Sequence, residues 1–239
     1  MNNKRKTLVV WLYRSMLLGL TAGLAGPAAA NLISDGDFET PVVPAGSFQL
    51  FGPGQSFASW TVVGAPGNVA PISGLFVSRG LSFPAEHGAQ WLDLTGLSNS
   101  ATAVQQSVAT TAGATYDLSF WVGNQVNPGG IYGVTSTVEV LVNGVSLGLF
   151  TNSGGAGSLS QTWEQFNTSF VASGSSADVE FLNRDAGADN TNGLDNIVLL
   201  QGQGGGGGGG GGSVPEPATL SLFGVSLAAL AFCRRRKAG

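Results

Sequence analysis

The chain has 239 residues, of which 38 are glycine, one is cysteine and one is histidine, and its formal net charge is −4. The single cysteine excludes an internal disulfide framework and a cysteine-rich zinc site, and the single histidine excludes a multi-histidine metal centre. Only 10% of the residues are charged while 43% are hydrophobic, a balance that argues against a disordered chain.

The charge is distributed unevenly along the chain. Residues 31–200 contain thirteen acidic residues but only two basic ones, Arg79 and Arg184, and so carry a net charge of −11. A surface this acidic repels phosphate backbones, so we expect no nucleic-acid partner. It is better suited to divalent cations and neutral ligands.

Residues 1–30 are predicted to be a secretory signal peptide. Basic residues between Lys4 and Arg14 precede an apolar stretch from Met16 to Gly26, and Ala28-Ala29-Ala30 supplies small residues for cleavage. The alternative is a membrane anchor, but the apolar stretch is shorter than the roughly 20 residues that cross a bilayer. We therefore expect the general secretion machinery to export the chain and the mature protein to begin at Asn31.

Residues 31–201 are predicted to form one all-β domain. Apolar and polar residues alternate over short stretches, and no stretch shows sustained helical periodicity. Asn143-Gly144 predicts a tight hairpin turn. Many short strands at this spacing are typical of a β-sandwich or jelly roll. The expected strands are 32–39, 59–63, 90–94, 103–108, 116–122, 138–142, 146–151, 166–170, 179–181 and 195–200.

A linker and a second signal follow the domain. Residues 202–213 include nine consecutive glycines, which predict a flexible tether. Residues 214–239 contain Pro215-Glu216-Pro217, then an apolar stretch at 218–233 and a basic cluster at 234–237. A helix over this stretch is about 24 Å long, slightly less than the hydrocarbon core, and flanking residues and local thinning make up the difference. We expect one transmembrane helix with its basic end in the cytoplasm and the domain outside.

This tail resembles the PEP-CTERM sorting signal, because Pro-Glu-Pro, a short transmembrane helix and an arginine cluster occur in that order. The resemblance implies a Gram-negative bacterium that makes exopolysaccharide, and an exosortase that recognises Pro215, Glu216 and Pro217. The expected route is secretion across the inner membrane, transient anchoring by the C-terminal helix, and then display at the cell surface or release into the extracellular matrix.

Four phrases in the domain carry a second resemblance: residues 31–39, 88–94, 113–120 and 193–199. In this order they are similar to the galactose-binding-like jelly rolls, which include carbohydrate-binding modules and the extracellular domains of plant cell-wall proteins of unassigned function. The resemblance implies a jelly-roll sandwich. It does not identify a ligand, because such folds host many functions.

Structural calcium is the one cofactor that the sequence suggests. In these jelly rolls the first and last strands often meet at a calcium ion, and the resemblance implies Asp37, Glu39 and Asp195 as its ligands. Carboxylate oxygens are what calcium prefers. The alternative is that the acidic residues at 35–37 accept local backbone hydrogen bonds in a turn.

Aromatic side chains are the candidates for binding sugar rings. Trp91 and Trp121 alternate out of phase with the apolar residues of their strands, so we expect both to point away from the core and to be exposed. Tyr132 follows in a glycine-rich loop. The alternative is that these rings pack, as most tryptophans in a sandwich do. Trp60 is expected in the core.

The sequence gives little support for catalysis. His87 is the only histidine, and no Gly-x-Ser-x-Gly motif places a nucleophile. We therefore expect a non-enzymatic module that binds carbohydrate or exopolysaccharide. One alternative is a structural or adhesive matrix protein without a small-ligand site. A glycoside hydrolase is less favoured, because it requires two carboxylates that flank one bond.

Overall fold

The computed structural model describes residues 30–127, 131–185 and 191–202. These residues belong to one compact unit. The predicted sorting motif and transmembrane helix lie outside them, as do nearly all of the predicted signal peptide and linker. None of the helices in the described ranges has the length and apolar character needed to cross a membrane.

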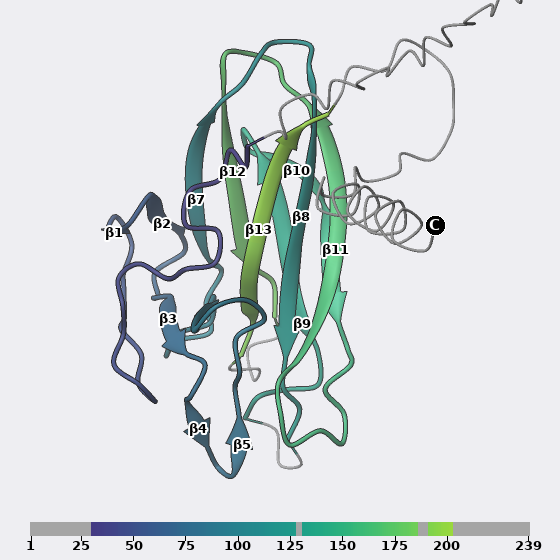
Figure 1. Ribbon diagram of the computed structural model, residues 1–239. Coiled ribbons are helices and arrows are strands. Elements are labelled where there is room, and N and C mark those ends of the chain that lie inside the picture. Colours follow the sequence, from purple (N-terminus) through teal and green to yellow (C-terminus); the bar gives the residue numbers. More distant parts are fainter. Residues whose placement is uncertain (1–29, 128–130, 186–190, 203–239) are drawn as a thin grey trace, which may run out of the picture. The chain divides into compact units, whose positions relative to one another are not determined.

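The described residues form an all-β jelly-roll sandwich (Figure 1). One sheet has six strands in the order β1-β2-β7-β12-β9-β10, the other has five in the order β11-β8-β13-β6-β3, and β4 and β5 form a separate hairpin. The strands are β1 (Ser56–Phe57), β2 (Trp60–Gly64), β3 (Ala70–Ser73), β4 (Val77–Ser78), β5 (Leu81–Ser82), β6 (Gln90–Asp93), β7 (Thr102–Ala109), β8 (Thr115–Asn124), β9 (Ser136–Val142), β10 (Val145–Asn152), β11 (Thr162–Val171), β12 (Ser176–Asn183) and β13 (Gly193–Gln201).

The main hydrophobic core lies between the two large sheets. Alternating residues of each strand point into it, as the period of two predicts. Phe120 of β8 packs edge-on against Phe181 of β12 in the opposite sheet, with ring centroids 5.2 Å apart. Trp60 is fully buried there, as predicted, and its indole N–H donates to the carbonyl of Asp35.

Most predicted strands are confirmed, with somewhat longer bounds. Asn143 and Gly144 have φ angles of 51° and 75° and join β9 to β10, which confirms the predicted turn. The sequence reading missed the short strands β1, β3, β4 and β5.

The predicted strand at 32–39 is wrong. Asp35 and Phe38 both have φ angles of 54°, which an extended strand does not allow. These residues instead form turns that run along β13, and the amide N–H of Leu32 donates to the carbonyl of Leu199. The turn places the ring of Phe38 in the main core, 5.5 Å from that of Trp60.

Candidate functional site

The outer face of the five-stranded sheet carries a second hydrophobic cluster. On β6, Leu92 points into the main core, so its neighbours Trp91 and Asp93 point to the opposite face. On β3, Ile72 pairs with Trp91 and Ala70 pairs with Asp93, so these four side chains share the outer face. The buried members of the cluster are Ala70, Ile72, Leu81, Phe83, Trp91 and Tyr132.

Trp91 is covered by residues that follow the β4–β5 hairpin and by a distant strand. Phe83, directly after β5, stacks on Trp91 with ring centroids 6.3 Å apart, and the Trp91 indole N–H donates to the Phe83 carbonyl. Trp163 of β11 packs edge-on at 6.0 Å. Trp91 therefore points outward, as predicted, but is only 1% exposed. The prediction that it is exposed is wrong, because alternation reveals the face and not what covers it.

Two glycines make room for the Trp163 indole on this face. Gly123 of β8 and Gly193 of β13 pair directly. A Cβ atom on Gly123 would lie 2.8 Å from the ring of Trp163, and one on Gly193 would lie 3.0 Å from it. The indole extends over these strands and its N–H donates to the carbonyl of Pro84.

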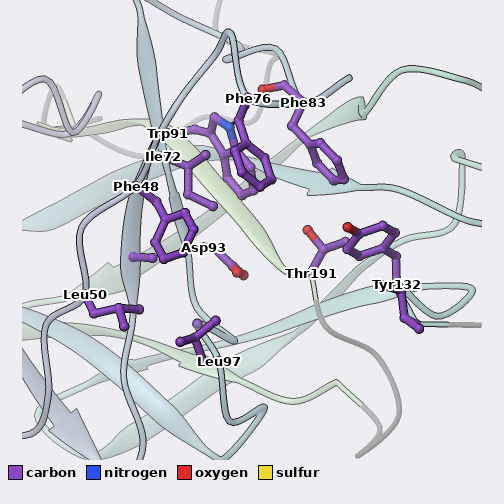
Figure 2. A pocket seen from close by; sticks show the side chains of 13 residues that line it. Phe48, Leu50, Ile72, Phe76, Phe83, Trp91, Asp93, Leu97, Tyr132 and Thr191 are labelled. Carbon is purple, nitrogen blue, oxygen red and sulfur yellow. Dashed lines mark hydrogen bonds between the residues drawn. The ribbon is translucent and has the colours of Figure 1, made fainter. Parts of the chain in front are cut away.

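A pocket of about 350 Å³ opens beside this cluster, a volume within the range of small-ligand sites. Figure 2 shows Phe76, Phe83 and Trp91 grouped on one side of it, Leu50 and Leu97 on the opposite side, and Asp93 between them. The lining residues are Phe48, Leu50, Ala70, Ile72, Phe76, Phe83, Trp91, Asp93, Gly96, Leu97, Ile131, Tyr132 and Thr191.

Asp93 is the acidic group of the pocket. One of its oxygens, Oδ1, accepts hydrogen bonds from the Thr95 hydroxyl and from the backbone N–H groups of Thr95 and Asn192. These bonds fix the carboxyl in place. Burial raises the pKa of Asp93 from 3.8 to about 6, and the three hydrogen bonds oppose that rise only in part.

The mouth of the pocket is apolar. Phe48 and Leu50 are each 38% exposed, and Leu97 is 67% exposed. Within the described ranges the arginines are Arg79 and Arg184, and neither lines the pocket. Arg184 instead pairs with Glu139 at 2.6 Å. The pocket therefore presents apolar surface and a carboxyl group, without a cationic side chain among its lining residues.

The structure brings two of the three predicted sugar-binding residues together. Trp91 and Tyr132 both line the pocket, and the Tyr132 hydroxyl lies 2.6 Å from that of Ser78. Trp121 is half-buried elsewhere on β8, where it pairs with Gln165 and Asp195, and it does not line the pocket.

Most of the pocket wall was missed by sequence reasoning. Phe48 and Leu50 alternate with polar neighbours, and so do Leu81 and Phe83, so a weak signal was present. The elements that carry these residues are too short to be recognised from periodicity, and their position over β3 and β6 is a tertiary property.

The residues predicted to bind calcium gather around one loop, residues 86–90, but they do not fit a calcium site. The carboxyl of Asp195 accepts the backbone N–H groups of residues 86, 87 and 196, and that of Glu39 accepts those of residues 89 and 90. Asp37 faces the exposed His87 imidazole at 3.5 Å. Over the described ranges, no group of three or more His, Cys, Asp or Glu side chains is arranged to hold a metal ion. The carboxylates fasten the loop instead.

Comparison with known families decides where this chain belongs. The family described as "Protein of unknown function (DUF642)" matches residues 31–199. The chain is a member of the DUF642 family. A PEP-CTERM protein-sorting motif matches residues 213–237 of this DUF642 protein, which confirms the resemblance of its tail. A search of curated proteins finds no significant match.

Solved structures similar to the DUF642 protein share its fold. A cyclase from Fischerella sp. TAU matches with 17% identity and a TM-score of 0.51, over 72% of this chain and 96% of the cyclase. A family 35 carbohydrate binding module from Clostridium thermocellum matches with 12% identity and a TM-score of 0.41, over 65% and 98% of the two chains. A second module, "Family 16 Carbohydrate Binding Module-2", matches with 18% identity and a TM-score of 0.38, over 72% and 100%.

Proposed function

We propose that this DUF642 protein is an exported, non-catalytic module that binds carbohydrate in the pocket beside β3 and β6. The observation that carries the proposal is the combination of aromatic walls with one fixed carboxyl group in a cavity of about 350 Å³. Ligand sites of this kind are mostly apolar, with a few polar groups that set orientation. Sugar rings suit such a site because their C–H faces pack on aromatic rings while their hydroxyl groups donate to acceptors.

The lining argues against hydrolysis of a glycosidic bond. Glycosidases generally place two carboxyl groups about 5–10 Å apart across the bond that they cleave. Asp93 is the one carboxylate among the residues that line this pocket. His87 is exposed and faces Asp37 at 3.5 Å. We therefore assign binding rather than catalysis to the site.

The pocket also favours binding over a purely structural role in a matrix. A structural or adhesive protein needs no cavity, whereas Phe48, Leu50 and Leu97 leave an apolar mouth open to solvent. Open apolar surface around a cavity is a feature of interaction sites.

The sorting motif supports a location outside the cell. We propose that the chain is secreted, held briefly in the inner membrane of a Gram-negative bacterium by its tail, and processed there by an exosortase. The ligand is then a polysaccharide of the cell surface or the extracellular matrix. Structural calcium has no place in the proposal, because the carboxylates of Asp37, Glu39 and Asp195 do not fit it.

A glycan array probed with residues 30–209 tests the proposal. This range holds both hydrophobic clusters and all the strand pairings described above, so we expect it to fold alone. We expect binding to at least one extracellular glycan. Leu97→Ser at the pocket mouth should weaken that binding about tenfold, since a difference of about 1.4 kcal/mol changes affinity tenfold.

Leu159→Ser is the matched control for that variant. Leu159 is 74% exposed, comparable to Leu97 at 67%, and does not line the pocket. Binding should be unchanged in the control. If no glycan binds, or if both variants bind like the parent protein, the proposed function is wrong.

A further inference from the structure

The polar groups of the pocket are fewer than the hydroxyl groups of an ordinary sugar. Asp93, Tyr132 and Thr191 are the lining residues whose side chains carry polar atoms. The Tyr132 hydroxyl already bonds to Ser78, and Oδ1 of Asp93 already accepts three hydrogen bonds. A fully hydroxylated hexose would bury several hydroxyl groups without partners, and each unpaired hydroxyl weakens binding.

The rest of the lining consists of hydrocarbon, apart from backbone groups. Leu50 and Leu97 lie across the pocket from the aromatic residues Phe76 and Phe83 (Figure 2). Ile72 adds a branched aliphatic side chain from the sheet itself. A methyl or acyl group on a sugar would gain contact with these side chains, whereas a hydroxyl group in the same place would lose its water.

The charge of the pocket opposes acidic sugars. A uronic acid carries a carboxylate, which would approach the buried Asp93 without a lining cation to offset the repulsion. Of the two arginines in the described ranges, Arg184 is paired with Glu139, and Arg79 lies on the turn between β4 and β5 outside the lining.

We propose that the pocket selects neutral sugar residues that carry an apolar substituent, such as 6-deoxy or O-acetylated sugars, over fully hydroxylated and acidic ones. This inference rests on the proposed function of the same site. The carboxyl of Asp93 accepts a ring hydroxyl, and the substituent lies against Leu50, Leu97 and Ile72.

Calorimetry with matched sugars tests the selection. The probes are the methyl glycosides of 6-deoxyglucose, glucose and glucuronic acid, the corresponding galactose and mannose series, and the O-acetylated form of each neutral sugar. With residues 30–209 we expect the 6-deoxy or O-acetylated member of at least one series to bind about tenfold more tightly than its parent sugar, a factor that corresponds to about 1.4 kcal/mol. The uronic acid of that series should bind most weakly.

Leu50→Ser links the preference to the pocket wall. Leu50 is 38% exposed, so its replacement is expected to leave the fold intact, which circular dichroism checks. We expect the ratio of the two affinities, substituted sugar over parent sugar, to fall toward one. Leu149→Ser, at a residue that is 64% exposed on β10, should leave the ratio unchanged.

The outcomes separate the two proposals. If a parent sugar or a uronic acid binds as tightly as the substituted sugars in every series that binds, the selection is wrong while carbohydrate binding stands. An unchanged ratio in Leu50→Ser also overturns the selection. If no sugar of any series binds and the glycan array is empty as well, both proposals are wrong.

Discussion

At the scale of single residues, the buried carboxyl of Asp93 has the most unusual environment in the pocket. Its partner atoms are the hydroxyl of Thr95 and the N–H groups of residues 95 and 192, which hold the end of β6 against the residue that precedes β13. Burial nevertheless raises its pKa from 3.8 to about 6. The position therefore serves both the fold and the pocket.

This environment predicts a pH dependence of stability. Because the pKa of Asp93 is higher in the folded state than in the unfolded chain, its contribution to stability is fully present below about pH 4 and is lost as the pH rises through about 6. The variant Asp93→Asn stays neutral. Relative to the parent protein, its free energy of unfolding should therefore rise by up to about 3 kcal/mol from pH 4 to pH 7, at about 1.4 kcal/mol per pKa unit.

Urea unfolding of residues 30–209 at both pH values measures the change. Asp117→Asn, at an exposed position on β8, is the control, and its difference from the parent protein should be the same at pH 4 and pH 7. A difference between Asp93→Asn and the parent that does not vary with pH would contradict the prediction.

At the scale of elements, the outer face of the five-stranded sheet depends on a close fit between three strands. Gly123 of β8 and Gly193 of β13 lie side by side, and the indole of Trp163 on β11 occupies the space that side chains would fill. The indole then packs against Trp91, 6.0 Å away. The two glycines thus place one wall of the second hydrophobic cluster.

Gly123→Ala should therefore destabilise the domain by displacing Trp163. The added Cβ would lie 2.8 Å from the indole, and overpacking of this kind costs about 1–3 kcal/mol. We expect a lower free energy of unfolding in urea and a shift in tryptophan fluorescence.

A second-site variant makes that prediction specific. In a Trp163→Leu background the ring is absent, so Gly123→Ala should cost clearly less. Gly174→Ala is the matched control, because its new Cβ would come no closer than 3.8 Å to its nearest neighbour atom. An equal cost of Gly123→Ala with and without the Trp163 ring would show that the indole is not the cause.

At the scale of the whole molecule, the chain combines a DUF642 domain at residues 31–199 with a PEP-CTERM motif at residues 213–237. The net charge of −4 averages a domain of −11 with basic residues at both ends. The domain supplies the pocket, and the motif determines where the domain is delivered.

Replacing Pro215, Glu216 and Pro217 together by alanine tests delivery. We expect the full-length protein to stay in the inner membrane as an unprocessed precursor, because the exosortase has lost its recognition element. Immunoblots of membrane and extracellular fractions from the native host measure this. Ser213→Ala, just before the motif, should be processed normally; normal release of the triple variant would show that Pro-Glu-Pro is not the recognition element.

The sequence by itself determined the all-β class, the Asn143-Gly144 hairpin and the assignment of Leu92 and Trp91 to opposite faces of β6. Each depends on local physics, namely the period of two in strands and the positive φ angles of a tight turn. The Pro-Glu-Pro tail was also readable, because its parts are contiguous in the chain.

Only the tertiary structure decided what covers each face. Trp91 points outward yet is buried, because Phe83 and Trp163 reach it from β5 and β11. Likewise, Asp195 and Glu39 meet the loop at residues 86–90 as acceptors of its N–H groups rather than as metal ligands. Such contacts join residues that are distant in the chain, and alternation within one strand holds no information about a partner that arrives from another.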